Sequence, residues 1–491
     1  MLTSSRSSAS TDSSGGHTPS CGAARDSSSP HDRWPRRPAG QGRSSQEGGG
    51  RSAPPDQLRR GHEGKGTPEG MTSPLRNRDF RYLWLALSSS LLAAGVWVIA
   101  LPLFTLHLGY GPATVGIVVG CGLIGTLASL LFGGALLDRH PKRTILAWSA
   151  FIPGTVLLAI CLWAEAATIP WYALAATAAI VGACDGVYGP ANESLLPEIV
   201  EKEHLHVGNS LQALVESLLL KAFGPAIGGA TIALAGPAPA LAVVGVLFLV
   251  TAAFSRQIVP AYEPPAPDRS AGWASVFQDI GDGFQYVAQT KWIWTAVLWS
   301  ALALLLQAGP RSVALPVVFG EGSAGAYALI MVGYGIASAV GSLVSSFAIR
   351  PDNRFGTLFA AWSLGSLPLI AIAFHPTVAV AAVAMVLVGL FNAYGNVLWQ
   401  TLMQQGVPDD LRGRVTSVDW FGSISLMPIS TVVTGLFIDH GIVRLLFLLA
   451  GTVPVVLAFI AYAIIAKDSS ANSDRTSTDP AENPPLDRTS G

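Results

Sequence analysis

The sequence predicts an all-α membrane protein with twelve transmembrane helices in two six-helix halves. Half of its residues are hydrophobic and only 12% are charged, whereas a soluble domain carries about 25% charged residues. The apolar residues fall in runs of about 20, the length that crosses a bilayer as a helix. The twelve runs are Tyr82–His107, Ala113–Leu137, Thr144–Trp163, Trp171–Tyr188, Val207–Leu234, Ala238–Ile258, Trp292–Val318, Ala324–Ile349, Phe355–Phe374, Val378–Met403, Val415–Ile438 and Val443–Ala466.

The segments outside these runs are hydrophilic. Residues 1–70 are rich in Ser, Gly, Pro and Arg, and such a composition buries too little apolar surface to offset the entropy lost on ordering. A translation start at Met71 is an alternative account of this stretch. The predicted organisation is a disordered N-terminal tail at 1–75, a six-helix half at 76–258, a cytoplasmic linker at 259–291, a second half at 292–467 and a disordered C-terminal tail at 468–491.

Lys and Arg are distributed unevenly between the two sides of the predicted bundle. The loops at residues 109–112 and 235–239 contain neither residue. Because short cytoplasmic loops carry an excess of Lys and Arg, we expect a multi-pass protein of the cell membrane with both termini in the cytoplasm. The cytoplasmic side would carry Arg76, Arg78, Arg81, Arg139, Lys142, Arg143, Lys202, Arg256, Arg269, Lys291, Arg350, Arg354, Arg412, Arg414 and Lys467.

Composition and motifs argue against several other classes of protein. The formal net charge of −1 gives no reason to expect a nucleic acid partner. The four cysteines show no metal-ligand spacing, so we expect neither a metal nor a cofactor. The chain has no HExxH, no GxSxG and no Walker loop, which argues against a membrane enzyme and an ATP-driven pump.

A charged turn, Gly134-Ala-Leu-Leu-Asp-Arg-His-Pro-Lys-Arg-Thr144, joins the second and third runs. Its charged residues, which include Asp138, Arg139 and Arg143, must lie in water or among lipid headgroups. The turn resembles the loop between helices two and three of the major facilitator superfamily (MFS), which reads roughly G-x-L-x-D-R-x-G-R-R, with Pro141 at a position usually held by Gly.

The resemblance implies a role for this turn as a conformational latch. Asp138 would contact the start of span eleven near Arg414–Ser417, where helix-end amides favour an anion, and hold the cytoplasmic side closed. Arg139 and Arg143 would pair with acidic groups, for which Asp419 and Glu193 are candidates. The alternative is that the basic residues only anchor the turn at the membrane surface.

Span five contains Gly224, Pro225, Gly228 and Gly229 in the pattern G-P-x-x-G-G. Proline bends a helix and glycines allow close approach of a neighbour, so the pattern could be purely structural. It also resembles a motif of MFS antiporters.

Two further stretches, Gly189–Val200 and Leu411–Trp420, resemble the drug-efflux branch called the DHA3, or macrolide-efflux-like, group. The resemblance covers residues 76–467 and implies a drug:proton antiporter.

Two carboxylates inside predicted spans are candidates for proton coupling. Asp185 lies in span four and Glu216 in span five. Charged residues within membrane spans are costly and mark functional sites, and a carboxylate in apolar surroundings can exchange a proton near neutral pH. The alternative is a structural ion pair with Lys221 or Arg311, although in an α-helix Lys221 would point about 140° away from Glu216.

Polar and aromatic residues on single faces of three spans are candidates for a substrate cavity. Amides and aromatic rings can hold amphipathic or cationic molecules without a fixed pattern. Hydrogen bonding between helices is an equally plausible role. The candidates are Asn209 and Gln212 in span five, Gln307 and Arg311 in span seven, and Asn392, Asn396 and Trp399 in span ten.

Together these features predict a secondary active transporter that acts as a monomer in the lipid bilayer. It would export a small organic molecule or drug in exchange for protons, by alternating access between two halves. Two alternatives stay open. One is a proton-linked uptake symporter of a small metabolite, and the other is a membrane sensor or scaffold that keeps the fold without transporting.

Overall fold

The prediction of twelve membrane-spanning helices is confirmed. In the computed structural model, twelve helical segments of the described part are long and apolar enough to cross a membrane, and the part of the chain that is described contains no strand. The described residues lie within one compact unit, Pro68–Gly491. They are residues 74–137, 140–200, 204, 208, 211–212, 215–259, 281, 283–320, 323–347, 353–408 and 411–477.

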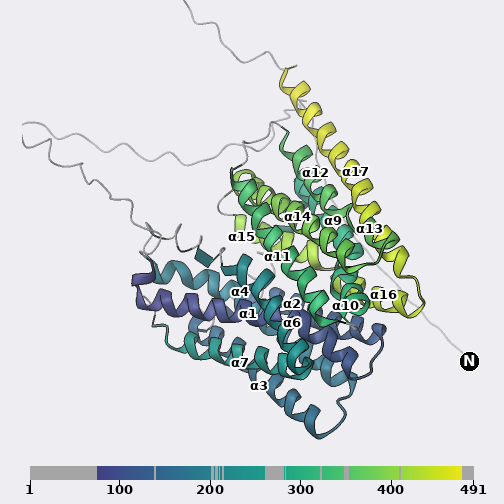
Figure 1. Cartoon of the computed structure of the whole chain (residues 1–491). Helices are drawn as coiled ribbons and strands as arrows, with labels where there is room; N and C mark the ends of the chain where they lie inside the picture. The colour runs from purple at the N-terminus through teal and green to yellow at the C-terminus, as the bar shows by residue number, and fades with distance from the viewer. Residues whose placement is uncertain are drawn as a thin grey trace, which may run out of the picture. The chain divides into compact units, whose positions relative to one another are not determined.

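The first half of the bundle contains six spans, coloured purple to teal in Figure 1. A short 3₁₀ helix, Pro74–Arg76, precedes them. Span five consists of a π-helix, η3, followed by an α-helix, α6. The helices are α1 (Arg78–His107), α2 (Pro112–Leu137), α3 (Lys142–Ala166), α4 (Trp171–Ile199), η3 (Glu216–Phe223), α6 (Gly224–Ala235) and α7 (Pro237–Arg256).

The second half also contains six spans, coloured green to yellow. Spans seven, nine and eleven are each built from more than one helical piece. The helices are α9 (Lys291–Gly309), η4 (Pro310–Ala314), α10 (Leu315–Gly320), α11 (Ala324–Phe347), α12 (Arg354–Ser366), α13 (Leu369–Phe374), α14 (Val378–Gly406), α15 (Arg412–Ile424), α16 (Met427–Asp439) and α17 (Val443–Ser477).

Two spans have a proline where their second helical piece begins. Pro225 and Pro428 each lie in the first turn of that piece, α6 in span five and α16 in span eleven. A proline has no amide hydrogen, so it is well tolerated where a helix begins. Both prolines occupy the fifth span of their half, which is what a duplicated fold would produce.

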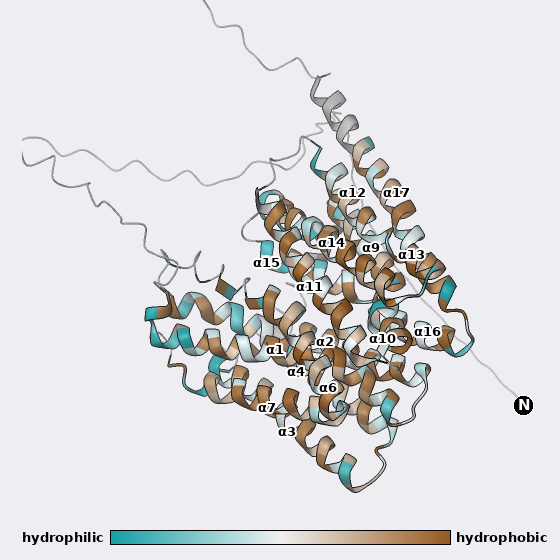
Figure 2. Cartoon of the chain, viewed as in Figure 1, coloured by the Kyte–Doolittle hydropathy of each residue, from teal (hydrophilic) through white to brown (hydrophobic). Residues whose placement is uncertain are grey.

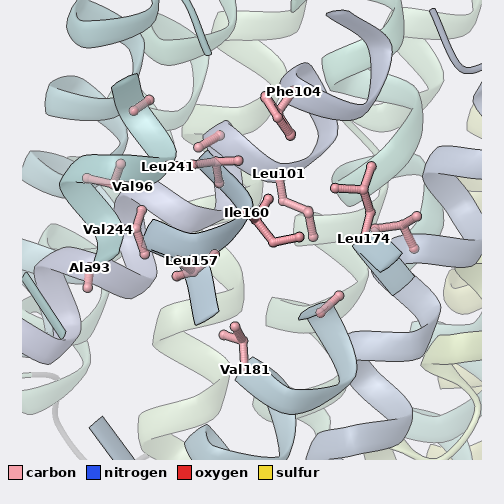
Figure 3. Close-up of a cluster of buried hydrophobic side chains, with 14 of the residues drawn as sticks. Ala93, Val96, Leu101, Phe104, Leu157, Ile160, Leu174, Val181, Leu241 and Val244 are labelled. Carbon is pink, nitrogen blue, oxygen red and sulfur yellow. The ribbon is translucent and has the colours of Figure 1, made fainter. Parts of the chain in front are cut away.

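Hydrophobic residues occupy most of the length of the helices, and hydrophilic residues are more frequent toward their ends (Figure 2). In the first half, a buried cluster joins α1, α3, α4 and α7 through Phe104, Leu157, Leu174 and Leu241, as Figure 3 shows. In the second half, several tryptophans of α9, α12 and α14 belong to the buried cluster. Each half therefore has a core of its own.

The two sides of the bundle can be distinguished by charge. We call the side where α1 begins and α2 ends the basic side, and the side where α1 ends and α2 begins the opposite side. Among the described residues, the halves meet where α2 packs on α16 and where α11 packs on both η3 and α6. Of the two pieces of span eleven, α2 packs mainly on α16, the piece at the opposite side. Gly116 of α2 lies so close to α16 that an added Cβ would be 2.4 Å from the carbonyl oxygen of Thr431.

Several predicted segments lie partly or wholly outside the described residues. Residues 1–73 and most of the linker, 260–280, are outside them. At the other end of the chain, α17 continues to Ser477. The helix therefore extends past residue 467, where the sequence alone placed the end of the second half.

Candidate functional site

The π-helix η3 brings Glu216 and Lys221 onto one face of span five. Their Oε1 and Nζ atoms are 3.9 Å apart. The prediction that Lys221 points away from Glu216 is wrong, because it assumed α-helical geometry. A π-helix closes its hydrogen bonds between residues five apart, so positions 216 and 221 stack above one another. The ion pair with Lys221, one of the two alternatives for Glu216, is the arrangement found.

The backbone of η3 is packed tightly between helices of both halves. A Cβ added to Gly95 of α1 would lie 2.6 Å from the carbonyl oxygen of Leu220. A Cβ added to Gly335 of α11 would lie 1.8 Å from the carbonyl oxygen of Lys221. Glycine at both positions admits the wide π turn. The ion pair therefore lies at the junction of the two halves.

The G-P-x-x-G-G pattern continues this contact into α6. Gly224 lies against Gly95 of α1, with 2.6 Å between the Cβ it would carry and the Gly95 Cα. Gly229 faces the other half, and its added Cβ would be 2.0 Å from the Cβ of Ala328 in α11. The motif thus packs on α1 within its own half and on α11 across the interface.

Asp185 lies on α4 next to the contact with α2. Its neighbours Gly182 and Gly186 face α2, where added Cβ atoms would lie 2.0 Å from the carbonyl oxygen of Gly122 and from Ser129 Oγ. Asp185 itself is exposed.

Glu193 of α4 is a further carboxylate near this place. It is exposed and interacts electrostatically with Glu216 of η3. Its predicted pairing with Arg139 or Arg143 stays a prediction, because Arg139 lies outside the described residues. Glu193 lies eight residues after Asp185, about 12 Å further along the helix.

Gln212 and Asn209 complete the predicted polar face of span five. Gln212 Nε2 is buried and has no hydrogen-bond partner among the described residues. Burial of an unpaired amide costs free energy, so a donor to a ligand is available at this point. Asn209 lies outside the described residues.

In the second half, Gln307 and Arg311 are bonded to protein groups. Gln307 is 4% exposed, and its Nε2 donates to Ser366 Oγ at 2.7 Å and to the carbonyl oxygen of Ala450 at 3.3 Å. These bonds match the interhelical alternative for Gln307. Arg311 lies in the π-helix η4 and donates from Nε to the carbonyl oxygen of Gln307 at 3.2 Å.

Trp399 of α14 is bonded to Asp419 of α15. Its Nε1 donates to Asp419 Oδ2 at 3.0 Å, and Ser423 donates to Asp419 Oδ1 at 3.4 Å. Trp399 and Ser423 both belong to the second half, as Asp419 does. Its predicted partner Arg143 lies in the first turn of α3, and Arg139 lies outside the described residues.

Asn396 and Asn392 lie beside the same aromatic side chains. Trp362 of α12 donates from Nε1 to Asn396 Oδ1 at 3.3 Å and stacks on Trp299 with 4.7 Å between ring centroids. Asn396 is exposed and Asn392 half-buried, the latter against Gly365 of α12. We call Trp292, Trp299, Trp362 and Trp399 the tryptophan cluster; its rings contact one another from α9, α12 and α14.

The described residues include only part of the predicted latch. Gly134 belongs to α2, whereas Asp138 lies outside the described residues. The next residues of the turn are tied to α4: Lys142 Nζ is 2.5 Å from Glu198 Oε1 and donates to the carbonyl oxygen of Ser194 at 3.1 Å.

A pocket of 450 Å³ lies between the halves on the opposite side. Its walls come from α1, α6 and α11, and include His107, Ile232 and Ser323. None of the residues predicted for the substrate cavity lines it. The candidate carboxylates lie instead on α4 and η3 in the first half, and the aromatic candidates lie in the tryptophan cluster, part of the buried core of the second half.

The chain is similar to known exporters over most of its length. The multidrug efflux pump Tap of Mycobacterium bovis is 26% identical over 396 residues, which cover 78% of this chain and 93% of that protein. The enterobactin exporter EntS of Citrobacter koseri is 23% identical, with 69% and 80% covered.

Solved structures show the same fold at low sequence identity. The nucleoside transporter NupG superposes with a TM-score of 0.63 at 13% identity, covering 79% of this chain and 99% of that one. A bacterial homologue of the iron transporter ferroportin, in an inward-facing state, gives a TM-score of 0.60 at 16% identity, covering 78% and 98%.

Residues 83–426 match the Major Facilitator Superfamily. This match spans most of the chain, and the similar proteins named above are transporters. With the twelve spans in two halves, it shows that the chain belongs to the Major Facilitator Superfamily of membrane transporters.

Proposed function

We propose that the protein exports a small organic molecule from the cytoplasm in exchange for protons. The observation that carries this proposal is the pair of Glu216 and Lys221 on η3, the helix that packs on α11 of the other half. Asp185 and Glu193 add two carboxylates on α4, in the same half as η3. Ionisable groups inside a membrane bundle mark ion and substrate pathways. Protonation of Glu193 or Glu216 would remove the repulsion between them and change the forces on η3.

The arrangement of the halves supports alternating access. Among the described residues, α2 packs far more on α16 than on α15, which favours a site that is open from the basic side. The excess of Lys and Arg assigns the basic side to the cytoplasm of a cell-membrane protein, with both termini there. The structure would then represent the state that receives substrate from the cytoplasm, and rocking of the halves would expose the site to the outside.

The substrate would contact residues from both halves. Gln212 offers an unpaired amide donor from span five, and Asn396 offers an exposed amide beside Trp362 of the tryptophan cluster. Rings and amides accept amphipathic molecules of varied shape. Tap, a relative of this chain, is named a multidrug efflux pump, which favours a broad range of small organic molecules. The protein would work as a monomer.

Purified protein in liposomes with an imposed pH gradient tests this function. Dyes and antibiotics are screened for movement in the direction opposite to the protons. The screen uses the native sequence first and then Asp185→Asn, Glu193→Gln and Glu216→Gln. Glu165→Gln is the matched control, because Glu165 is an exposed carboxylate near the far end of α3. Gradient-driven export should be lost in at least one of the three variants and kept in the control.

The direction of flux separates the alternatives. Accumulation of a compound on the side to which protons also move would support a proton-linked uptake symporter. No flux of any compound in either direction would support a sensor or scaffold.

A further inference from the structure

We propose that Asp439 is a positioning residue that holds the opposite side of the bundle closed. It is the last residue of α16, in the second half. Its Oδ2 accepts a hydrogen bond at 3.2 Å from the backbone amide of Ala113, in the first turn of α2, in the first half. The residues are 326 positions apart, and this bond connects the two halves directly.

The packing of α2 on α16 brings the carboxylate to this amide. Gly435 lies four residues before Asp439, on the same face of α16. A Cβ added to Gly435 would be 2.5 Å from the carbonyl oxygen of Pro112. The absence of a side chain at Gly435 thus lets the start of α2 lie directly on α16, and Asp439 reaches the first turn of α2 one helical turn further on.

The chemistry of the contact favours a carboxylate. The first amides of a helix have no partner within the helix, and the helix N-terminus carries a partial positive charge. Asp439 supplies both an acceptor for the Ala113 amide and a negative charge at that end of α2. The contact exists only while the halves touch on the opposite side, so it stabilises the closed arrangement over the open one.

This contact would be the counterpart of the proposed latch on the basic side. Spans two and eleven run in opposite directions, and each ends in an aspartate near the start of the other: Asp439 at the start of α2, and Asp138, by resemblance, near Arg414–Ser417. One carboxylate would be engaged in each state of the cycle. This inference rests on the proposed alternation of the two halves.

Distances between spin labels test the role of Asp439 without any substrate. Labels are attached to Thr168→Cys and Pro376→Cys, two exposed positions on the opposite side, one in each half, after the four native cysteines are changed to Ser. Asp439→Asn keeps an acceptor but removes the charge, and Asp439→Ala removes both. Each substitution should raise the population of molecules with a long distance between the labels, relative to the population with a short one. We expect this ratio to rise by about two- to fivefold for Asn and by at least as much for Ala.

Asp79→Asn is the matched control. Asp79 Oδ1 accepts from the backbone amide of Val259 at 3.0 Å, the same chemistry within a single half, so the distances should not change. An Asp439→Ala protein with the native distances, or an Asp79→Asn protein with the same shift, would overturn the proposal. A shift in distances without proton-driven flux would refute the proposed export while leaving this contact established.

Discussion

The two halves of the bundle carry different side chains. In the first half, α4 and η3 carry the carboxylates Asp185, Glu193 and Glu216. In the second half, the tryptophan cluster carries aromatic rings, with the carboxylate of Asp419 bonded to an indole. Both halves contain six spans, but their side chains differ. We infer that the carboxylates of the first half handle protons, and that the second half supplies the aromatic part of the contacts with the organic substrate.

The largest effect is expected on proton coupling, from a change to a carboxylate of the first half. Glu216→Gln removes the charge that Lys221 and Glu193 face, so coupling between the proton gradient and export should fall by about tenfold or more. The measurement is the initial rate of export with and without a pH gradient. Binding of the substrate to purified protein should change far less, and a rate that keeps its full dependence on the gradient would remove Glu216 from the proposed mechanism.

The substrate side should respond in the opposite way. Trp399→Phe keeps an aromatic ring but removes the indole and its donor to Asp419. The smaller ring attracts a cation less strongly, an effect of about 0.5–1 kcal/mol, so we expect KM for a cationic dye to rise by about two- to fivefold. The dependence of the rate on the pH gradient should persist. A variant that loses its gradient dependence with KM unchanged would reverse the assignment of the two halves.

The junction between the halves gives a third, structural prediction. Gly335→Ala would place a methyl group against the Lys221 carbonyl of the other half, whereas Gly341→Ala would place one 2.1 Å from the Leu390 carbonyl within the second half. Overpacking costs about 1–3 kcal/mol, so both variants should lower Tm.

Spin-label distances across the halves separate these two variants. Only Gly335→Ala should lengthen the distance between Thr168→Cys and Pro376→Cys. Equal lengthening by Gly341→Ala would mean that the junction at η3 has no special part in holding the halves together.

The smallest effect is expected at the turn between α2 and α3. The Lys142–Glu198 pair is partly exposed, with 25% and 16% of the side chains accessible, and such pairs contribute about 0.2–1 kcal/mol. A double-mutant cycle with Lys142→Met and Glu198→Gln, followed by Tm, should give a coupling energy in this range and no change in gradient dependence. A loss of coupling between protons and export would instead place this pair in the mechanism.

Local sequence patterns predicted the spans, but they could not predict contacts between residues that are far apart in the sequence. Twelve apolar runs of membrane-spanning length identify the fold, because length and hydropathy are properties of a single segment. Gln307 shares a face with Arg311 in the sequence, but its partners Ser366 and Ala450 are 59 and 143 residues away. No pattern in span seven could indicate that the Gln307 amide donates to other helices of the second half.

The contacts of Lys221 and Asp439 also could not be predicted from the sequence, and each has a physical reason. The pairing of Lys221 with Glu216 depends on a π-helix, and a reading based on 3.6 residues per turn places these side chains on different faces. Asp439 lies at the end of an apolar run, where a charged residue is ordinary. Its importance follows only from the packing of α16 on the start of α2.

The most direct test follows proton movement driven by the substrate. Liposomes that contain the protein and a pH-sensitive dye are given a gradient of a transported compound, with no initial pH difference. The account predicts that protons move against the direction of the compound in the native protein, and that Glu216→Gln abolishes this movement while Trp399→Phe only shifts the concentration at which it is half-maximal. Protons that move with the compound, or an unchanged proton flux in Glu216→Gln, would contradict the account.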